Sequence, residues 1–389
     1  MTTSRIGVGL ISVGWMGRLH TRGYRGICEF FPELDVDVDL VVAADPVESS
    51  ARYAVDRLGY RSAASDYRDV LANPDVDVVS ICSPNFLHHE IAVAAAKAGK
   101  HFWIEKPMGR SLAESQAIAS AAAEAGVKTA VGFNYRHVPS LQHARDLVRS
   151  GALGRINSVR AAFLADYAAD PDTALSWRFI QAQSGPGVLS DLMSHAVDLA
   201  QYIVGPVSEV TALTEIFIKE RPLPATQGAV AFAKGGTEGP RGTVETDDYA
   251  ALLARFAEGA VGTIEASRAH VGPHAEYTIE IYGTEGSVRW NFHYMNELQL
   301  AMRQEAGYRT VRAAPGQGEF GRFQPGIGLS MGFDDLKTIE AYQFVRSVIE
   351  DTQIAPSAEE GRSAIAVVQA ALDSVSSGRW EKVAGPVRP

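Results

Sequence analysis

The stretch Arg5-Ile-Gly-Val-Gly-Leu-Ile11, followed by Ser12-Val-Gly14-Trp-Met-Gly17, is the part of the sequence that decides the fold. Its first seven residues predict a short buried strand, and the helix after the glycine turn is expected to reach about Phe31. A strand, a glycine turn and a helix in this order are typical of a dinucleotide site, because glycines let the backbone approach a pyrophosphate at the helix N-terminus. Ser12 replaces the first glycine of the Gly-x-Gly-x-x-Gly pattern, so the match is partial and its context has to support it.

An acidic residue follows the second predicted strand, residues 38–44. In a dinucleotide-binding fold, a carboxylate at the position of Asp45 accepts hydrogen bonds from both ribose hydroxyls and repels a 2′-phosphate. Pro46, and not an arginine, comes next, so no cation is ready for a phosphate there. The sequence therefore favours NAD over NADP, the alternative being that Asp45 only caps a helix.

Strands and helices alternate as far as residue 134. Helices are expected over 66–72, 85–98 and 112–125, and strands over 76–82, 100–104 and 128–134. This alternation with apolar strands predicts a doubly wound parallel (Rossmann) sheet, whose ligands bind at the carboxyl ends of its strands. The polar segments of this part fall at those ends, at residues 12–17, 45, 83–88, 105–107 and 134–136.

The pattern changes after residue 134. Alternating strands are expected at 156–167, 207–218, 249–257, 260–270, 277–282, 287–291 and 297–302, with hairpin turns such as Gly283-Thr-Glu-Gly286 between them. They predict an α+β domain with a mostly antiparallel open sheet and helices on one face. The expected division is a Rossmann domain over 1–134 and a substrate-binding and oligomerisation domain over 135–389. Within the latter, residues 222–248 predict a long excursion, 315–332 a lid or subunit-contact arm, and 333–350 and 358–376 closing helices.

One helix is expected to carry Asp191 and His195, which are four residues apart and so project from the same face. A carboxylate beside an imidazole can orient a hydroxyl and take its proton near neutral pH, the alternative being a structural hydrogen bond. Lys106 lies between Glu105 and Pro107, at a strand end that faces the predicted nicotinamide. A cation there would favour the alkoxide form of a bound alcohol, the alternative being a solvated surface charge.

Composition excludes several classes of protein. The 389 residues, 46% of them hydrophobic and 21% charged, are ordinary for a globular chain of two domains. A net charge of -10 argues against a nucleic-acid partner, and no apolar run approaches the ~20 residues of a membrane helix. Cys28 and Cys82 are far apart, which predicts neither a disulfide framework nor a metal site and fits a reducing compartment. The residues before the first strand are too few for a signal peptide, so a cytoplasmic location is expected.

Four motifs resemble the Gfo/Idh/MocA oxidoreductases, which include glucose–fructose oxidoreductase and inositol dehydrogenases. They are Gly9-Leu-Ile-Ser-Val-Gly14-Trp-Met-Gly17, Ser83-Pro84-Asn85-x-x-His88, Glu105-Lys106-Pro107 and Gly187-x3-Asp191-x3-His195-x2-Asp198. The resemblance covers essentially the whole chain. Further segments, at residues 133–136, 175–179, 195–202, 283–286 and 315–332, are most similar to the levoglucosan dehydrogenase and inositol dehydrogenase-like members.

The resemblance implies an NAD(P)-dependent enzyme that transfers hydride between nicotinamide and a secondary alcohol or ketone of a levoglucosan-, glucoside- or inositol-like molecule. The implied catalytic residues are Lys106, Asp191 and His195. His195 would take the hydroxyl proton, Lys106 would stabilise the developing oxyanion, and Asp191 would fix the sugar and polarise His195; which of Lys106 and His195 is the base stays open.

The resemblance also implies the residues around each ligand and the assembly. The expected cofactor residues are Ser12, Val13, Gly14, Trp15, Met16, Asp45, Ser83, Asn85, His88, Glu105 and Lys106. The expected substrate residues are Tyr135, Arg136, Trp177, Arg178, Asp191 and His195. A homodimer or homotetramer through the C-terminal sheet is expected, and no metal.

Two other functions stay open. One is a keto-sugar reductase of a biosynthetic pathway, whose diphosphate substrate would need cations such as Arg136 and Arg178. The other is a non-catalytic dinucleotide-sensing regulator. The regulator predicts the loss of at least one of Lys106, Asp191 and His195, and all three are present.

Overall fold

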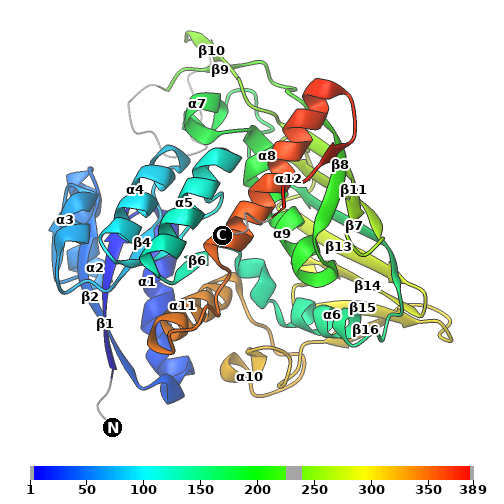
Figure 1. Cartoon of the computed structure of the whole chain (residues 1–389), viewed down its shortest axis with the longest axis horizontal. Helices are drawn as coiled ribbons and strands as arrows, with labels where there is room; N and C mark the ends of the chain where they lie inside the picture. The colour runs from blue at the N-terminus through cyan, green and yellow to red at the C-terminus, as the bar shows by residue number, and fades with distance from the viewer. Residues whose placement is uncertain (1–3, 225–238, 386–389) are drawn as a thin grey trace. The chain divides into compact units, whose positions relative to one another are not determined.

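The computed structural model describes residues 4–224 and 239–385, and the chain divides into two compact units (Figure 1). The first unit comprises residues 1–137 and 314–362, and the second comprises 138–313 and 363–389. The expected division at residue 134 placed everything after it in one domain. The structure differs because residues 314–362 return to the N-terminal part, where the helix Phe333–Ile349 (α11) packs along Trp15–Phe30 (α1).

The first unit contains a parallel sheet with the strand order β3-β2-β1-β4-β5-β6. The strands are β1 (Ser4–Ile11), β2 (Val36–Ala44), β3 (Ser62–Ala64), β4 (Val78–Ile81), β5 (His101–Ile104) and β6 (Thr129–Val131). The connecting helices are α1, α2 (Glu48–Leu58), α3 (Tyr67–Ala72), α4 (Asn85–Lys97) and α5 (Leu112–Ala125). Shorter helices are η1 (Pro32–Leu34), η2 (Asn134–His137) and α10 (Phe320–Phe323).

The order of the strands along this sheet reverses between β1 and β4. Chain order runs from β1 to β3 on one side and from β4 to β6 on the other, and right-handed crossovers therefore put the two sets of helices on opposite faces (Figure 1). The predicted doubly wound parallel sheet is confirmed. Ligands of such sheets bind where the order reverses, at the carboxyl ends of the strands.

Close packing explains why α11 belongs to the first unit. A Cβ atom at Gly23 of α1 would lie 2.7 Å from the carbonyl oxygen of Lys337, so the glycine lets the two helices approach closely. Just after the end of α1, the ring of Phe31 stacks on that of Tyr342 of α11, with centroids 3.8 Å apart. The apolar face of α1 is thus covered by a segment that lies some 300 residues later in the sequence.

The second unit contains a sheet with the order β16-β15-β14-β13-β7-β12-β11-β8-β17, in which the pair β7–β12 is parallel and the other pairs are antiparallel. Its strands are β7 (Ile156–Leu164), β8 (Val207–Glu215), β11 (Tyr249–Phe256), β12 (Val261–Ser267), β13 (Glu276–Gly283), β14 (Gly286–Asn291), β15 (Glu297–Met302), β16 (Arg309–Arg312) and β17 (Glu381–Lys382). A separate hairpin pairs β9 (Glu220–Pro222) with β10 (Arg241–Thr243). The predicted mostly antiparallel sheet is confirmed.

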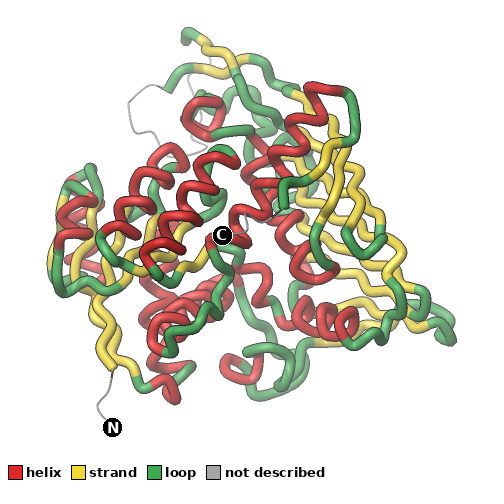
Figure 2. The backbone as a smooth tube through the Cα atoms, in the orientation of Figure 1, coloured by secondary structure: helices red, strands yellow, loops and turns green. Residues whose placement is uncertain are grey.

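Helices cover one face of this second sheet (Figures 1 and 2). The helix α9 (Met193–Val204) packs on β7, β12 and β13, and α6 (Pro139–Arg149) packs on β14 and β15. The remaining helices of this part are α7 (Gln181–Ser184), α8 (Gly187–Asp191), α12 (Ala358–Ser377), η3 (Trp177–Phe179) and η4 (Phe292–Tyr294). Along β13 the buried Tyr277, Ile279 and Ile281 alternate with more accessible residues, as expected for a sheet with one covered face.

Three predicted segments can be compared with the structure. The helix expected to carry both Asp191 and His195 is interrupted at Leu192, so Asp191 ends α8 while His195 lies in the first turn of α9. Of the excursion predicted over 222–248, residues 225–238 lie outside the described residues, and its described part includes β10, which pairs with β9. The arm predicted over 315–332 contains α10 and belongs to the first unit.

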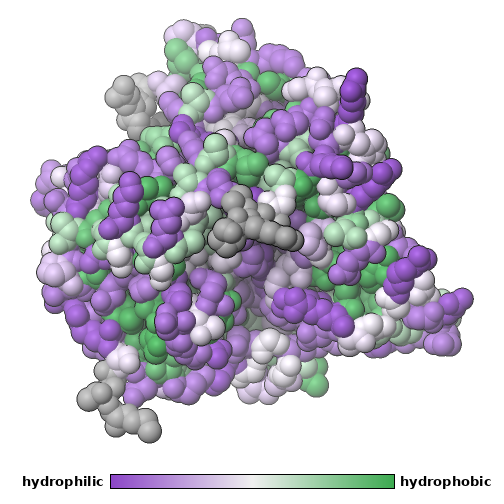
Figure 3. All heavy atoms as spheres, viewed as in Figure 1, coloured by the Kyte–Doolittle hydropathy of each residue, from purple (hydrophilic) through white to green (hydrophobic). Residues whose placement is uncertain are grey.

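Polar side chains predominate over the face of the molecule shown in Figure 3, with smaller apolar areas between them. Across residues 4–224 and 239–385, none of the helices combines the length and the apolar character that crossing a membrane requires.

Candidate active site

The turn between β1 and α1 keeps the geometry of a phosphate-binding loop despite the serine at its start. Ser12 has a φ of 74°, a left-handed conformation that glycine adopts most easily. A Cβ atom at Gly17 would lie 2.2 Å from the carbonyl oxygen of Ser12, so the helix can start this close to the loop only with glycine there. At Gly14, by contrast, a Cβ would meet no atom within 4 Å, which leaves the backbone open to a ligand.

Asp45 connects this loop to the end of β2. Its Oδ2 accepts a hydrogen bond of 2.9 Å from the backbone N–H of Val13, and its Oδ1 accepts one of 2.9 Å from the backbone N–H of Val47. Asp45 is therefore not the helix cap considered as the alternative, because α2 (Glu48–Leu58) has Val47 at its N-cap and no side-chain cap hydrogen bond. Each carboxylate oxygen has a further lone pair, so the same side chain can also accept from ribose hydroxyls.

Several features at the carboxyl ends of the strands of this sheet fit a bound dinucleotide. The 16-residue helix α1 has no side-chain cap, so its first N–H groups are available to an anion, and the helix dipole favours negative charge at that end. At the end of β4, the buried Ser83 Oγ has no hydrogen-bond partner among the described residues, which leaves it a donor for a ligand. Trp15 is 69% exposed, and its ring lies nearly parallel to that of Phe333, with centroids 6.0 Å apart.

His88, which was expected to be a cofactor residue, lies buried between two turns. Its Nδ1 is 2.9 Å from the carbonyl oxygen of Pro107 and its Nε2 is 2.9 Å from that of Ser83. Burial lowers the pKa of His88 below its usual value. With both ring nitrogens next to backbone carbonyls, His88 links the turn after β4 to the turn after β5, and so supports Ser83 and the segment next to Lys106.

Glu105 ends β5 and is surrounded by charged side chains. Lys337 Nζ lies 2.7 Å from Glu105 Oε1, and His20 Nε2 lies 2.9 Å from the same oxygen. Burial raises the pKa of Glu105, but the Lys337 ammonium and the His20 hydrogen bond outweigh it and hold that pKa well below the ordinary range. Glu105 is thus an ionised carboxylate fixed by its neighbours. Lys337 was not found from the sequence, because 232 residues separate it from Glu105.

Tyr135 and Arg136 lie in η2, directly after β6, and Asn85 begins α4 at the end of β4. The guanidinium of Arg136 forms an ion pair with Glu360, and the ring of Tyr135 meets that of Phe333 edge-on at 6.1 Å. A carboxylate thus already neutralises the arginine that a diphosphate substrate would need.

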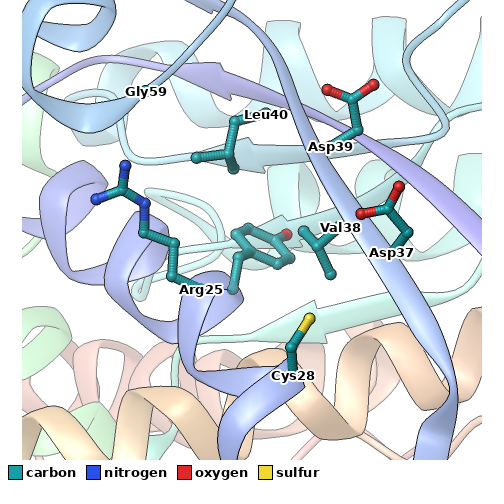
Figure 4. A pocket seen from close by; sticks show the side chains of 8 residues that line it. Arg25, Cys28, Asp37, Val38, Asp39, Leu40 and Gly59 are labelled. Carbon is teal, nitrogen blue, oxygen red and sulfur yellow. The ribbon is translucent and has the colours of Figure 1, made fainter.

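A separate cavity of about 420 Å³ lies beside the first half of β2 (Figure 4). Arg25 and Cys28 of α1 line one side of it, and Asp37 and Asp39 of β2 line another. At about 3.3 Å per residue along β2, it lies roughly 20 Å from Asp45, which follows the opposite end of the strand. This cavity is not part of the predicted cofactor edge.

In the second unit, Asp191 is gathered with the residues predicted to bind substrate. Arg178 Nη1 lies 3.9 Å from Asp191 Oδ2, and the Arg178 guanidinium lies over the ring of Trp177, 4.5 Å from its centroid. The hydroxyl of Tyr167 donates a hydrogen bond of 2.8 Å to the same oxygen of Asp191. Tyr167 was missed as a site residue because the sequence placed it at the end of a strand, whereas β7 ends three residues earlier.

His195 is 7% exposed and lies beside Phe163, with ring centroids 5.9 Å apart. Its backbone carbonyl accepts a hydrogen bond of 2.7 Å from the hydroxyl of Tyr277, and the rings of Tyr277 and Phe163 stack at 4.6 Å. Aromatic side chains of the sheet therefore fix both the backbone and the surroundings of this histidine.

A buried frame supports the segment that carries Trp177 and Arg178. The guanidinium groups of Arg221 and Arg268 both lie over the ring of Phe179, 4.2 and 4.6 Å from its centroid. Arg268 forms a 2.9 Å ion pair with Asp248, and Thr246 Oγ1 donates a 3.1 Å hydrogen bond to the Arg178 carbonyl. This frame fixes the backbone of η3 and so the starting point of the Arg178 side chain.

Comparison with known proteins adds to this geometry. Residues 6–133 match the oxidoreductase family with an NAD-binding Rossmann fold, and residues 141–289 match the GFO/IDH/MocA C-terminal domain. The chain belongs to the GFO/IDH/MocA family. The resemblance of the sequence motifs to that family is confirmed, and this GFO/IDH/MocA chain is an NAD-binding oxidoreductase.

Among its relatives, levoglucosan dehydrogenase of Pseudarthrobacter phenanthrenivorans is 38% identical over 383 residues, which cover 97% of this chain and 98% of the relative. Myo-inositol 2-dehydrogenase of Thermotoga maritima is 27% identical over 377 residues, which cover 97% of this chain and 98% of the relative. A solved structure of levoglucosan dehydrogenase in complex with NADH and levoglucosan is 36% identical, with a TM-score of 0.90 over 98% of this chain and 100% of that chain. This GFO/IDH/MocA chain therefore shares its whole fold with sugar dehydrogenases.

Proposed function

We propose that this chain is an NAD-dependent dehydrogenase that transfers hydride between nicotinamide and a secondary alcohol of a sugar or cyclitol. The observation that carries the proposal is the placement of Asp191, which is held by Tyr167 and flanked by Arg178 in the unit that also contains His195. An ionised carboxylate and a guanidinium can together bind neighbouring ring hydroxyls, as an acceptor and a donor. The relatives named for levoglucosan and inositol support this substrate class.

The residues divide the reaction between them. When bound, NAD supplies the acceptor for the hydride of the carbinol carbon. His195 accepts the proton of the reacting hydroxyl, and the Lys106 ammonium stabilises the negative charge that develops on its oxygen. Asp191 accepts a hydrogen bond from the substrate and orients His195. The alternative assignment makes Lys106 the base in place of His195, and variants of each residue separate the two roles.

For the cofactor, Val13, Gly14 and Trp15 at the start of α1 would hold the pyrophosphate, and Asp45 the adenosine ribose. The carboxylate of Asp45 would repel a 2′-phosphate, and the neighbouring Pro46 offers no compensating cation. Solved relatives in complex with NADH support NAD as the cofactor. Ser83 and Asn85 would line the nicotinamide side.

We also infer that copies of the chain pair through the outward face of the second sheet as a homodimer or homotetramer. Leu213 of β8, Leu253 of β11 and Val261 of β12 are 61%, 51% and 52% exposed. Exposed apolar residues on adjacent strands are typical of an interface. Sedimentation of the purified chain tests this, and a monomer at micromolar concentration would contradict it.

The free Cys28 and Cys82 fit the cytoplasmic location that we propose.

A substrate panel tests the proposed activity. The purified chain is mixed with NAD and with anhydro sugars, hexoses, glucosides and inositols in turn, and the absorbance of reduced nicotinamide is followed. At least one ring alcohol is expected to reduce NAD, and NADP is expected to be a poorer acceptor. Tight NAD binding without turnover on any member of the panel would instead support a dinucleotide-sensing regulator. Activity confined to keto-sugar reduction would support the biosynthetic alternative.

A further inference from the structure

The first unit buries an unusual cluster of ionisable side chains directly before Lys106. His20, Lys337 and Glu340 are 0%, 1% and 1% exposed, and Glu105 is 8% exposed. They come from three elements: α1 supplies His20, β5 leads into Glu105, and α11 supplies Lys337 and Glu340. Two carboxylates and one ammonium leave the cluster with one net negative charge.

The contacts converge on the carboxylate of Glu105. Lys337 Nζ lies 2.7 Å from Glu105 Oε1 and 2.7 Å from Glu340 Oε2. His20 contacts Glu105 through Nε2, and its ring stacks on Trp103 with centroids 3.4 Å apart. The Lys337 ammonium lies 5.4 Å from the centroid of the same Trp103 ring. Glu105 is therefore held from two sides, with Trp103 placing both partners.

Gly132, after β6, provides an independent sign that the fold is built around this carboxylate. A Cβ atom at Gly132 would lie 2.8 Å from both oxygens of Glu105, closer than real Cβ contacts allow. The backbone N–H of Gly132 donates a 2.9 Å hydrogen bond to the carbonyl of Ile104, the residue before Glu105. The glycine thus leaves room for the carboxylate while its backbone holds the adjoining peptide.

The protonation states of His20 and Glu105 do not change near neutral pH, so their hydrogen bond stays the same. Burial lowers the pKa of His20 to about 4, so its ring is neutral and carries a single N–H. The ionised carboxylate of Glu105 has no proton to donate, so this N–H is on Nε2, the nitrogen that faces it. The other ring nitrogen, Nδ1, lies 3.1 Å from Ser80 Oγ. Each partner of Glu105 is thus held by a neighbour of its own.

Stability alone is a weak reason for such a cluster, since replacing a buried ion pair by apolar residues of similar size is often neutral or stabilising. The peptide bond that follows Glu105 leads directly to Lys106. We propose that Lys337 is a positioning residue: its ammonium holds Glu105 in one place and thereby fixes the backbone from which Lys106 reaches the substrate. This inference rests on the proposed function, in which Lys106 stabilises the oxyanion.

The decisive variant is Lys337→Met combined with Glu340→Gln. It removes the ammonium from Glu105 but leaves the cluster with the same net charge, which limits the cost of taking the counter-charge away from the buried carboxylate. The rate of hydride transfer in a single turnover should fall about 10- to 100-fold, because small misplacements of a catalytic group have effects of that size. The dissociation constant of NAD should stay close to that of the wild type, so the loss appears in kcat.

Two further variants separate positioning from folding. Gly132→Ala leaves every charge in place but pushes on the Glu105 carboxylate, and it is expected to lower kcat in the same direction. Lys128→Met removes a lysine whose ammonium lies 2.8 Å from Asp351 in the same unit, and it serves as the control with unchanged kcat. Melting temperatures are measured for all variants, so that a loss of folded protein is not mistaken for a loss of rate.

The outcomes distinguish the two proposals. A charge-balanced double variant with wild-type kcat, together with an inactive Lys106→Met, would overturn the role of Lys337 and leave the proposed function standing. A fully active Lys106→Met would contradict the proposed function, and the inference with it. A folded double variant that binds NAD but transfers hydride slowly is the result that supports the role of Lys337.

Discussion

The hydroxyl of Tyr167 donates a hydrogen bond of 2.8 Å to Oδ2 of Asp191. Burial, with the nearby carboxylate of Asp191, raises the pKa of Tyr167 well above its usual value, so the hydroxyl stays protonated and remains a donor. Arg178 approaches the same carboxylate oxygen at 3.9 Å. Asp191 is therefore oriented by its own protein, an arrangement that lowers the free energy needed to reorganise the site during reaction.

Removing this hydrogen bond should reduce activity without affecting the cofactor. Tyr167→Phe is expected to lower kcat/KM for the sugar about 10- to 100-fold, the usual range for a hydrogen bond to a charged group. Steady-state kinetics with NAD at saturation measure the effect. Tyr202→Phe is the matched control, since its hydroxyl bonds to Gln142 in the same unit. Equal kinetics for Tyr167→Phe and Tyr202→Phe would exclude an orienting role for Tyr167.

The charge of Asp45 should set the choice of cofactor. Asp45→Asn keeps one oxygen to accept the backbone N–H of Val13 or Val47 but removes the charge that repels a 2′-phosphate. The preference for NAD over NADP, measured as the ratio of dissociation constants, is expected to fall by about tenfold or more, which corresponds to roughly 1.4 kcal/mol. An unchanged ratio would show that Asp45 acts only by accepting the backbone N–H groups of Val13 and Val47.

The buried ion pair beneath η3 should matter for stability. The side chains of Arg268 and Asp248 are 3% and 0% exposed, so Asp248→Asn leaves a buried guanidinium without its counter-charge. The free energy of unfolding should fall by about 3–5 kcal/mol, as for other broken buried pairs. Glu209→Gln, which removes the half-buried partner of the exposed Arg255, should change the free energy of unfolding by less than about 1 kcal/mol. Urea unfolding measures the free energy of unfolding of both variants. Equally small losses in Asp248→Asn and Glu209→Gln would contradict a stabilising role for the pair of Arg268 and Asp248.

Acid should destabilise the first unit before its carboxylates titrate. Burial lowers the pKa of His20 to about 4 and that of His137 to about 3, so both are neutral in the folded protein. In the unfolded chain they take up a proton near pH 6.5. Their contribution to stability is therefore complete above pH 6.5 and falls with decreasing pH by about 1.4 kcal/mol per unit for each histidine, down to the folded pKa.

His137→Leu removes the contribution of His137 to this pH dependence. The substitution breaks no hydrogen bond of the side chain, because neither ring nitrogen of His137 has a hydrogen-bond partner in the described part of the chain. Urea unfolding from pH 7 to pH 4.5 should show a shallower loss of stability in this variant than in the wild type. A slope equal to that of the wild type would mean that His137 is protonated in the folded protein.

The sequence predicts the elements of this fold well where the information is local. Alternating apolar strands and helices indicated the parallel sheet, and the place of Asp45 after β2 followed from the same pattern. Local periodicity could not reveal that α11 packs along α1, or that Lys337 reaches Glu105, because such pairs depend on the return of a distant segment. The interruption at Leu192 was also missed, since the helical spacing of the residues continues through it.

The most direct test of the account is a single turnover on NAD with a sugar or cyclitol that the wild type oxidises, comparing wild type with His195→Ala. The variant is expected to form reduced nicotinamide about 10²- to 10⁴-fold more slowly while binding NAD with nearly unchanged affinity, as for the loss of a general base. Formation of reduced nicotinamide at the wild-type rate in His195→Ala would contradict the account.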